Sequence, residues 1–316
     1  MLRCGRISRL VLLASLLFAW SLARPANPKT ILIVKSRNLV PYNQAVAGLR
    51  KTLDGSGVKV QLREVEFPLE VQRQEAFLRS IETLNPDLVV TVGTQATLSV
   101  TRRIRTIPVV FSLVLFSGES ESLLQKTHPN VTGAAMDIPM GLQFERLREV
   151  IPAIRRIGVI FNPLNSQSEI ELARRAAEES NLSLIEIPVT SEAEVLGQVE
   201  GLKGKVDVLW SVADSTVFTP RSVDSILLLT LRDGIPFVGL SPSFVKAGAL
   251  LSFSCDYADV GAQSAEEVLG ILSGKSPTEI PVAFPRRISL FVNPNTAHAI
   301  HLEISQKLQA EVEFLR

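Results

Sequence analysis

The chain has 316 residues, with 33 Lys and Arg against 32 Asp and Glu, which gives a formal net charge of +1. With 46% hydrophobic and 21% charged residues, the composition is typical of a globular protein and excludes a disordered chain, and the balanced charge argues against nucleic-acid binding. At about 100–200 residues per domain, the length predicts two domains.

The first 23 residues have the pattern of a secretory signal peptide. Three arginines precede an uncharged apolar run from Leu10 to Trp20, and a small-x-small cleavage site follows, ending at Ala23. The run is about half of the roughly 20 residues that a bilayer-spanning helix needs. We therefore expect cleavage near Ala23 and a periplasmic mature protein. Separately, we expect a monomer.

Cysteine and histidine give little support for catalysis or metal binding. Cys4 lies in the signal, so Cys255 remains alone and cannot form a disulfide within the chain. We expect Cys255 to be a small buried residue, since a nucleophile would need a nearby histidine. His298 and His301 could share a helix face, but two histidines without a third ligand are weak evidence for a metal. We expect no metal and no cofactor.

Short hydrophobic runs alternate with helical stretches along the mature chain. The runs are continuous rather than alternating, which is typical of parallel strands covered by helices on both faces. The predicted strands are Ile31–Val34, Val58–Leu62, Leu88–Val92, Pro108–Leu115, Ile157–Phe161, Leu182–Ile187, Val206–Val212, Pro236–Leu240, Ala249–Ser254 and Ile288–Val292. The predicted helices are Asn43–Leu53, Val71–Leu84, Gln95–Ile104, Leu142–Ile151, Glu169–Ser180, Ala193–Leu202, Pro220–Arg232, Asp259–Leu272 and Thr296–Phe314. This alternation favours doubly wound α/β sheets.

The pattern restarts in the middle of the chain. A strand near Lys29 opens the first half and a similar strand at Arg155 opens the second, and each is followed by a polar loop, a helix and another strand. Two α/β lobes facing a cleft are therefore expected, with Ser117–Pro139 as a candidate linker. Ligands of such sheets bind beyond the carboxyl ends of the strands, so those ends are where binding residues are sought.

In the first half, Gly93 and Thr94 follow a predicted strand and open a helix. The amides and hydroxyls at this helix start are suited to a carboxylate. The alternative is an ordinary helix cap in which Thr94 satisfies a free amide. Ser112 places a hydroxyl at the end of the next predicted strand.

In the second half, polar side chains again follow strands. Asn162 and Asn165 form a turn that could reach a ligand or be a plain turn. Asp214 could receive a ligand ammonium; alternatively, Asp214 or Thr216 caps the helix that follows.

Two further strand ends carry Ser243 and Asp256, and this aspartate could cap a helix or complete the cleft. No GxSxG, P-loop or HExxH motif is present. A ring of hydroxyls, amides and carboxylates suits recognition of a small zwitterion better than bond-making. We therefore expect no enzyme.

A set of short motifs occurs in order along nearly all of the mature chain. These motifs are Pro86–Ala96, Ile107–Phe111, Asn130–Gly133, Ile151-Pro152, Arg156–Pro163, Asp214–Val217, Ser241–Ala249, Tyr257–Gly261, Ile280–Val282, and Asn293 with Ala297. As an ordered set they resemble the ABC transporter substrate-binding family of the tryptophan- and tyrosine-binding type, a branch of the type I periplasmic binding fold.

The resemblance implies an α/β fold of two doubly wound parallel-sheet lobes, joined by three crossovers and a hinge, that close on a ligand. Lobe 1 would comprise residues 28–133 plus 256–279, and lobe 2 residues 134–255 plus 280–316. The ligand-binding residues carried over are Thr94, Gln95, Ala96, Ser112, Asn162, Asn165, Asp214, Thr216, Ser243 and Asp256. The helix start would receive a carboxylate, and Asp214 or Asp256 would receive an ammonium or another polar head group. Four aromatic residues could form walls of the cleft, but we expect most of them to pack in the hydrophobic core. They are Phe111, Phe161, Phe218 and Phe244.

Two loops depart from the family pattern. Ser112–Gly118 lacks the Asp-Pro pair that the family usually carries after the strand. The loop Lys35–Tyr42 carries Lys35 and Arg37, which could favour an acidic ligand or simply solvate the surface.

We expect an exported solute-binding protein that captures a small, amino-acid-like organic ligand and presents it to the membrane permease of an ABC importer. The alternative is a ligand-sensing subunit for a membrane signalling protein. An exported enzyme on the same fold would need a perturbed acid–base pair beside a nucleophile, and the sequence offers none.

Overall fold

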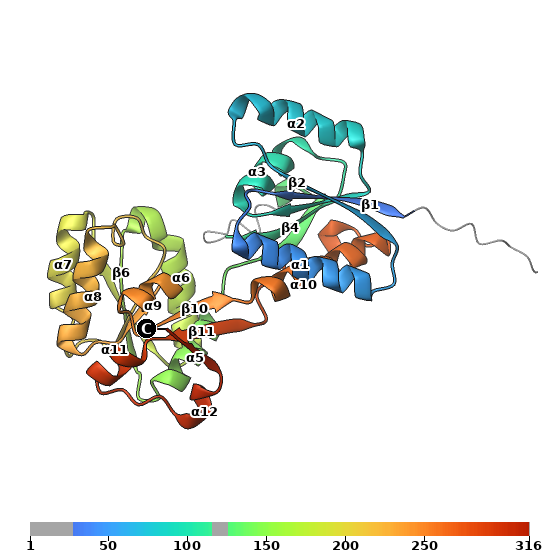
Figure 1. The fold of residues 1–316 in the computed structure, drawn as a ribbon. Coiled ribbons are helices and arrows are strands. Elements are labelled where there is room, and N and C mark those ends of the chain that lie inside the picture. The colour runs from blue at the N-terminus through green and yellow to red at the C-terminus, as the bar shows by residue number, and fades with distance from the viewer. Residues whose placement is uncertain (1–27, 116–125, 316) are drawn as a thin grey trace, which may run out of the picture.

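The computed structural model describes residues 28–115 and 126–315. The chain forms two α/β lobes, each built on a single sheet with helices packed against it (Figure 1). This architecture confirms the predicted fold class. The predicted signal peptide lies outside the described residues.

Lobe 1 contains an all-parallel five-stranded sheet of order β2-β1-β3-β4-β5. Its inner strands are almost wholly buried, as continuous apolar runs require, whereas the edge strand β2 is more exposed. The strands are β1 (Lys29–Lys35), β2 (Val60–Glu66), β3 (Leu88–Val92), β4 (Val109–Val114) and β5 (Val131–Ala135). The helices of this lobe are α1 (Val40–Gly55), α2 (Val71–Leu84), α3 (Thr94–Arg103) and α10 (Tyr257–Leu272).

Lobe 2 contains a seven-stranded sheet of order β12-β11-β10-β9-β8-β6-β7. Its strands are β6 (Arg156–Phe161), β7 (Ser183–Pro188), β8 (Val208–Trp210), β9 (Phe237–Gly239), β10 (Leu251–Cys255), β11 (Ile288–Val292) and β12 (Val312–Phe314). The helices are α5 (Met140–Val150), α6 (Pro163–Glu179), α7 (Glu192–Glu200), α8 (Ser222–Asp233), α9 (Pro242–Ala247), α11 (Pro294–Ala299) and α12 (Gln306–Gln309). Only β10 and β11 pair antiparallel among the strands described, because the chain leaves β10 for the other lobe and returns in the opposite direction.

The chain crosses between the lobes three times within the described ranges. It leaves β5 to enter α5, leaves β10 to enter α10, and returns through residues 284–287 to β11. Before that return, residues 280–283 run beside β5, where the amide of Ala135 donates to the carbonyl of Ala283 at 2.8 Å. Because β5 and β10 each lead to the other lobe from their carboxyl ends, the carboxyl edges of both sheets face the seam between the lobes.

Helix α10 follows β10 of lobe 2 in the chain but packs in lobe 1 against α1 (Figure 1). Two glycines allow the backbones to approach closely. A Cβ at Gly48 would lie 1.9 Å from the carbonyl oxygen of Ala258, and a Cβ at Gly261 would lie 1.9 Å from that of Ala45. This contact fixes the second crossover to the body of lobe 1.

Every predicted strand is present, and the main errors lie in connecting segments. The predicted linker Ser117–Pro139 is wrong in part, because Val131–Ala135 forms β5; residues 116–125 lie outside the described ranges. The predicted helix Thr296–Phe314 is also wrong. Helix α11 ends at Ala299, His301 adopts a positive φ of 55°, and the chain then forms α12 and β12. Helix α9 was not predicted.

The aromatic residues that could have been cleft walls belong to the core. Phe111 and Phe161 are buried in the sheets. Phe218 and Phe244 pack around Phe237, with ring centroids 6.2 to 6.4 Å apart. The expectation that most of these rings are core residues is confirmed.

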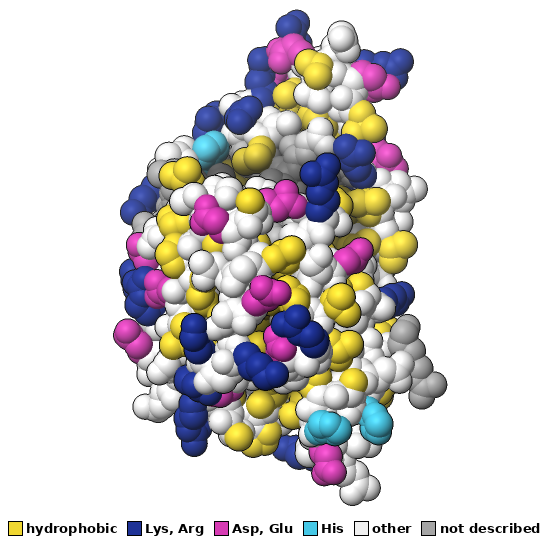
Figure 2. Space-filling view, turned by 90° about the vertical axis from the view of Figure 1, so that its left-hand side faces the viewer, with side chains coloured by type: hydrophobic (Ala, Val, Ile, Leu, Met, Phe, Trp, Pro, Cys, Tyr) yellow, Lys and Arg dark blue, Asp and Glu magenta, His cyan; other side chains and the backbone are white. Residues whose placement is uncertain are grey.

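The surface mixes charges of both signs. Figure 2 shows basic and acidic side chains interspersed over the face that lobe 2 presents to the viewer. Among the helices that the structure describes, none is long and apolar enough to cross a membrane.

The α1–α10 contact predicts a large cost for a single methyl group. Gly261→Ala should lower the free energy of unfolding by about 3 kcal/mol, because the new Cβ meets backbone that cannot move independently. Gly197→Ala on α7 is the matched control, since a Cβ there meets nothing within 4 Å and should stabilise the helix by about 0.5–1 kcal/mol. Urea denaturation measures both; equal stability of the two variants would contradict the tight contact.

Candidate functional site: the cavity between the lobes

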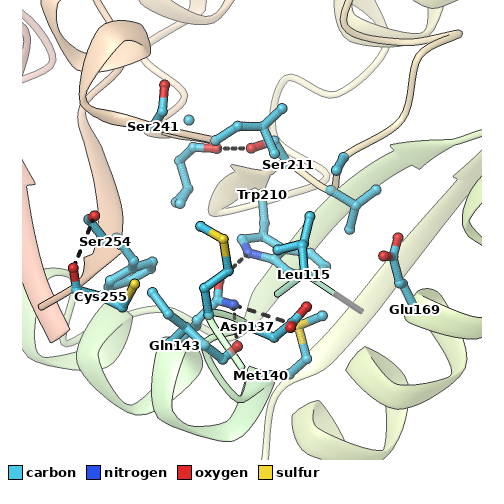
Figure 3. Close-up of a pocket in the computed structure, with 18 of the residues that line it drawn as sticks. Leu115, Asp137, Met140, Gln143, Glu169, Trp210, Ser211, Ser241, Ser254 and Cys255 are labelled. Atoms are coloured by element: carbon cyan, nitrogen blue, oxygen red, sulfur yellow. Dashed lines mark hydrogen bonds between the residues drawn. The ribbon is translucent and has the colours of Figure 1, made fainter. Parts of the chain in front are cut away.

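A cavity of about 370 Å³ opens at the seam (Figure 3). Its walls come from the carboxyl ends of β8, β9 and β10, from the first crossover, from α5 and α6, and from Leu115 after β4. It is lined by Leu115, Met136, Asp137, Ile138, Met140, Gln143, Glu169, Trp210, Ser211, Val212, Ala213, Val238, Gly239, Leu240, Ser241, Pro242, Phe253, Ser254, Cys255 and Tyr257. The lining is mainly apolar, with a few polar groups, which is the usual chemistry of a small-molecule site.

Trp210 is held in a fixed position at the floor of the cavity. Its Nε1 donates to Oε1 of Gln143 at 3.1 Å, and its ring meets Phe144 edge-on with centroids 5.4 Å apart. The Gln143 amide in turn donates to the carbonyl of Ile138 at 2.8 Å. The indole, which is only 2% exposed, is therefore positioned before any ligand arrives, and it forms part of the cavity wall.

Glu169 and Asp137 supply negative charge to the cavity. Glu169 is half-buried, and in Figure 3 it lies across the cavity from Ser254 and Cys255. Burial raises the pKa of the Glu169 carboxyl, and the charges of Asp137 and Asp214 raise it further.

Cys255 is confirmed as a buried residue, with 5% of its surface exposed. Burial raises the pKa of its thiol to about 12, with a smaller contribution from the neighbouring Asp256. The thiol is therefore neutral at physiological pH and is a poor nucleophile. Among the residues described, no group of three or more His, Cys, Asp and Glu side chains is placed to hold a metal ion.

Four of the residues singled out from the sequence form one cluster in lobe 2. Asn162 caps α6 and donates through Nδ2 to the hydroxyl of Thr216 at 3.0 Å, and Asn165 donates to the same hydroxyl at 3.0 Å. Asp214 is 2% exposed and accepts hydrogen bonds from Asn162 N, Asn165 Nδ2, Ser166 Oγ, Thr216 N and Val217 N. Asp214 thus ties the loop after β8 to the start of α6, and its carboxylate is already saturated with donors.

These bonds also govern the ionisation of Asp214. Burial alone would raise its pKa, but the hydrogen bonds, led by those from the amides of Asn162 and Thr216, hold the pKa below its usual range. The carboxylate is therefore ionised and satisfied within the protein, and of the two readings of Asp214 the geometry favours the structural one.

The residues singled out in lobe 1 lie at the start of α3. Thr94 is half-buried, Gln95 is exposed and Ala96 is buried. Gly93, with a φ of 88°, precedes the helix, and the hydroxyl of Ser36 accepts from the Ala96 amide at 2.9 Å. Ser36, which the sequence did not indicate, therefore provides the cap that the alternative reading assigned to Thr94.

The other residues singled out lie apart from the cavity in this form. The Ser112 side chain is buried within β4, Ser243 is exposed on α9, and Asp256 caps α10 through bonds from Ala258 N and Asp259 N. None of the ten residues lines the cavity, although their neighbours Ala213, Pro242, Cys255 and Tyr257 do.

The two atypical loops have structural roles. Lys35 is buried and pairs with Glu64 and Asn43, each at 2.8 Å, so its charge is neutralised within lobe 1. In the second loop, Leu113 adopts a positive φ of 54° at a register shift between β4 and β5. Leu115 beyond it lines the cavity. Residues 116–125 lie outside the described ranges.

Sequence reasoning missed the residues that line the cavity. Trp210 lies inside a predicted apolar run, and Glu169 and Gln143 lie within helices rather than after strands. The sequence around each of these residues contains no signal of a binding site. They meet at the cavity because the first crossover places α5 beside the end of β8.

The family model and a curated relative both match most of the chain. The model of a family described as ABC transporter substrate binding protein matches residues 41–313. A tyrosine-binding protein of Clostridioides difficile (strain R20291) is 23% identical over 262 residues, covering 82% of this chain and 74% of the relative.

Two solved structures share the fold. The ligand-free, open structure of a substrate-binding protein with adhesive properties from Clostridium difficile aligns with a TM-score of 0.75 and 21% identity, covering 91% of this chain and 99% of the other. An ABC domain from Streptococcus pneumonia in complex with L-Trp aligns with a TM-score of 0.60 and 19% identity, covering 92% and 100%.

Asp214→Asn should destabilise the protein by about 3 kcal/mol at neutral pH, because an amide nitrogen would face donors that the carboxylate now accepts. Since the pKa of Asp214 is lowered in the folded state, this contribution is present above the unfolded-state pKa and is lost as the pH falls through the folded-state pKa. The difference from wild type should therefore shrink in acid. Urea denaturation over a pH series measures it, with the exposed Asp224→Asn as control; a penalty that is independent of pH would be inconsistent with this role.

The Cys255 thiol should resist alkylation in the folded protein. At pH 8 its high pKa leaves almost no thiolate to react, and only 5% of the residue is exposed. Mass spectrometry after iodoacetamide treatment should find Cys255 unmodified in the native state and fully modified in guanidinium chloride. Rapid alkylation of the native protein would show that the thiol is accessible.

Proposed function

This chain belongs to the ABC transporter substrate binding protein family, and we propose that it captures a small, amino-acid-like ligand in the cavity between its lobes and presents it to the permease of an ABC importer. The observation that carries the proposal is the cavity itself, which opens where the carboxyl edges of both sheets meet the crossovers. The role is one of binding, and no bond needs to be made or broken.

The connections between the lobes support capture by closure. Each lobe has its own sheet and core clusters, so each can move as a unit. The crossovers at residues 136–139, 256 and 284–287 are short segments at which small backbone rotations change the angle between the lobes. A ligand that contacts both lobes would favour the closed form by the free energy of the contacts that exist only there.

The size and lining of the cavity support a ligand of amino-acid dimensions. Its volume of about 370 Å³ is near the lower end of the usual range for small-molecule sites. Trp210, Phe253 and Tyr257 offer rings, and Ser254 and Tyr257 present hydroxyls that are 3.2 Å apart. The relatives named for tyrosine and L-Trp support the same class of ligand.

The start of α3 supplies the opposing contact when the lobes close. The amides of Thr94 and Gln95 belong to the first turn of the helix, where amides have no carbonyl partner within the helix. They face the seam side of lobe 1 because α3 follows the carboxyl end of β3. In this proposal they receive the ligand carboxylate, while the rest of the ligand stays on the lobe 2 floor.

The sequence and the family support the remaining elements of the proposed role. The amino-terminal pattern of arginines, apolar run and cleavage site supports export to the periplasm. The partner is then the permease, which recognises the closed and ligand-loaded form.

Isothermal titration of the purified protein against the amino acids and small carboxylates should give saturable binding for at least one aromatic amino acid. Small-angle scattering with that ligand should show a smaller radius of gyration, because closure brings the lobes together. Absence of binding to any amino acid at millimolar concentration would count against the proposed ligand class.

Trp210→Phe should weaken that binding at least 10-fold, because it removes both the indole face and the bond that orients Gln143. Phe237→Leu is the matched control, since it trims an aromatic ring of the same sheet that packs in the core with Phe218 and Phe244. Both variants should lose stability, but only Trp210→Phe should lose affinity. Equal affinities in the two variants would remove Trp210 from the site.

A further inference from the structure

Glu169 differs from the buried carboxylates Asp214 and Asp259, and unlike Glu267, which is buried away from the cavity, it lines the cavity wall. Asp214 accepts five hydrogen bonds and Asp259 pairs with Arg286 at 3.0 Å. Glu169 faces the cavity, and no donor or cation from residues 28–115 or 126–315 bonds to its carboxylate. An ionised carboxylate in such a half-buried position costs free energy that a cation entering the cavity would offset.

The surroundings of Glu169 make that cost larger. Asp137 on the first crossover and Asp214 after β8 both add negative charge, and each raises the pKa of Glu169. Within the described parts of the chain, the residues lining the cavity include no lysine, arginine or histidine. The titratable groups on the far side, Cys255 and Tyr257, are a neutral thiol and a phenol. The described lining of the cavity therefore carries the Glu169 carboxylate without a basic side chain beside it.

The apolar part of the lining favours a large and polarisable ligand body. Trp210 and Phe253 lie at the strand ends, and Met136 and Met140 add two thioethers from the first crossover and α5. Methionine sulfur makes favourable contacts with aromatic rings, and its flexible side chain adapts to their shape. The same cavity wall therefore offers apolar contacts for an aromatic ring of the ligand and the carboxylates of Glu169 and Asp137.

We propose that Glu169 is the counter-ion of the ligand's ammonium group, so that the cavity selects aromatic ligands that carry a primary amine over those that carry only a carboxylate. This inference rests on the proposed function and specifies which end of the ligand lobe 2 holds. The ligand cation would occupy the space between Glu169 and Asp137, and the ring would lie against Trp210 and the thioethers.

Three indole probes that differ in one group test the assignment: L-tryptophan, tryptamine without the carboxylate, and indole-3-propionate without the amine. Titration of the wild-type protein should show indole-3-propionate binding at least 10-fold more weakly than L-tryptophan. Glu169→Gln should weaken L-tryptophan and tryptamine at least 10-fold and leave indole-3-propionate within about 2-fold. Glu169→Asp, which keeps the charge, should lose less than Glu169→Gln.

The matched control is Glu171→Gln, which removes one exposed negative charge from the same helix and should leave all three affinities unchanged. A second readout separates a binding role from a structural one. Glu169→Gln should raise the melting temperature of the ligand-free protein, because it removes a half-buried charge that faces Asp137 and Asp214.

The outcomes distinguish this inference from the proposed function. Equal binding of indole-3-propionate and L-tryptophan to wild type, or an equal effect of Glu169→Gln on all three probes, would overturn the role of Glu169 while leaving ligand capture intact. Absence of binding of every probe and every amino acid to wild type would overturn the proposed ligand class, and this inference with it.

Discussion

The structure depends on one constraint: the chain passes between two separately packed sheets only at their carboxyl edges. Strands β5 and β10 lead into the opposite lobe, and the return to β11 completes the connection. Because parallel strands present their loops and helix starts at that edge, the polar and variable parts of both lobes are brought to one seam. The close contact between α1 and α10 then anchors the second crossover to the body of lobe 1.

The cavity at the seam combines a rigid floor with an incomplete set of contacts. Trp210, Gln143 and the carbonyl of Ile138 form a chain of hydrogen bonds that orders the lobe 2 side before binding. Lobe 1 contributes Leu115 to the lining. The proposed closure requires contacts that the ligand makes only when the lobes meet. A cavity that is ordered on the lobe 2 side and incomplete on the lobe 1 side meets this requirement.

Charged groups near the seam divide into two kinds. Asp214 and Lys35 are satisfied by neighbouring residues, so their charges hold loops in place within each lobe. Glu169 faces the cavity with its charge unpaired by any residue in the described ranges, and is destabilised by its acidic neighbours. The two kinds differ in the number of hydrogen-bond and ion-pair partners that the fold places around each charged group.

The sequence by itself determined the fold class, the family resemblance and the strands other than β5 and β12. It could do so because burial on both faces leaves continuous apolar runs and strand ends leave recognisable turns. It also located Asn162, Asp214 and the start of α3 as polar strand ends, which they are. Only the tertiary structure decided that Asp214 is saturated, that Ser36 caps α3, and that Trp210, Gln143 and Glu169 share a cavity. Those relations join residues far apart in the chain and depend on the path of the crossovers, for which a linear pattern of hydrophobicity carries no signal.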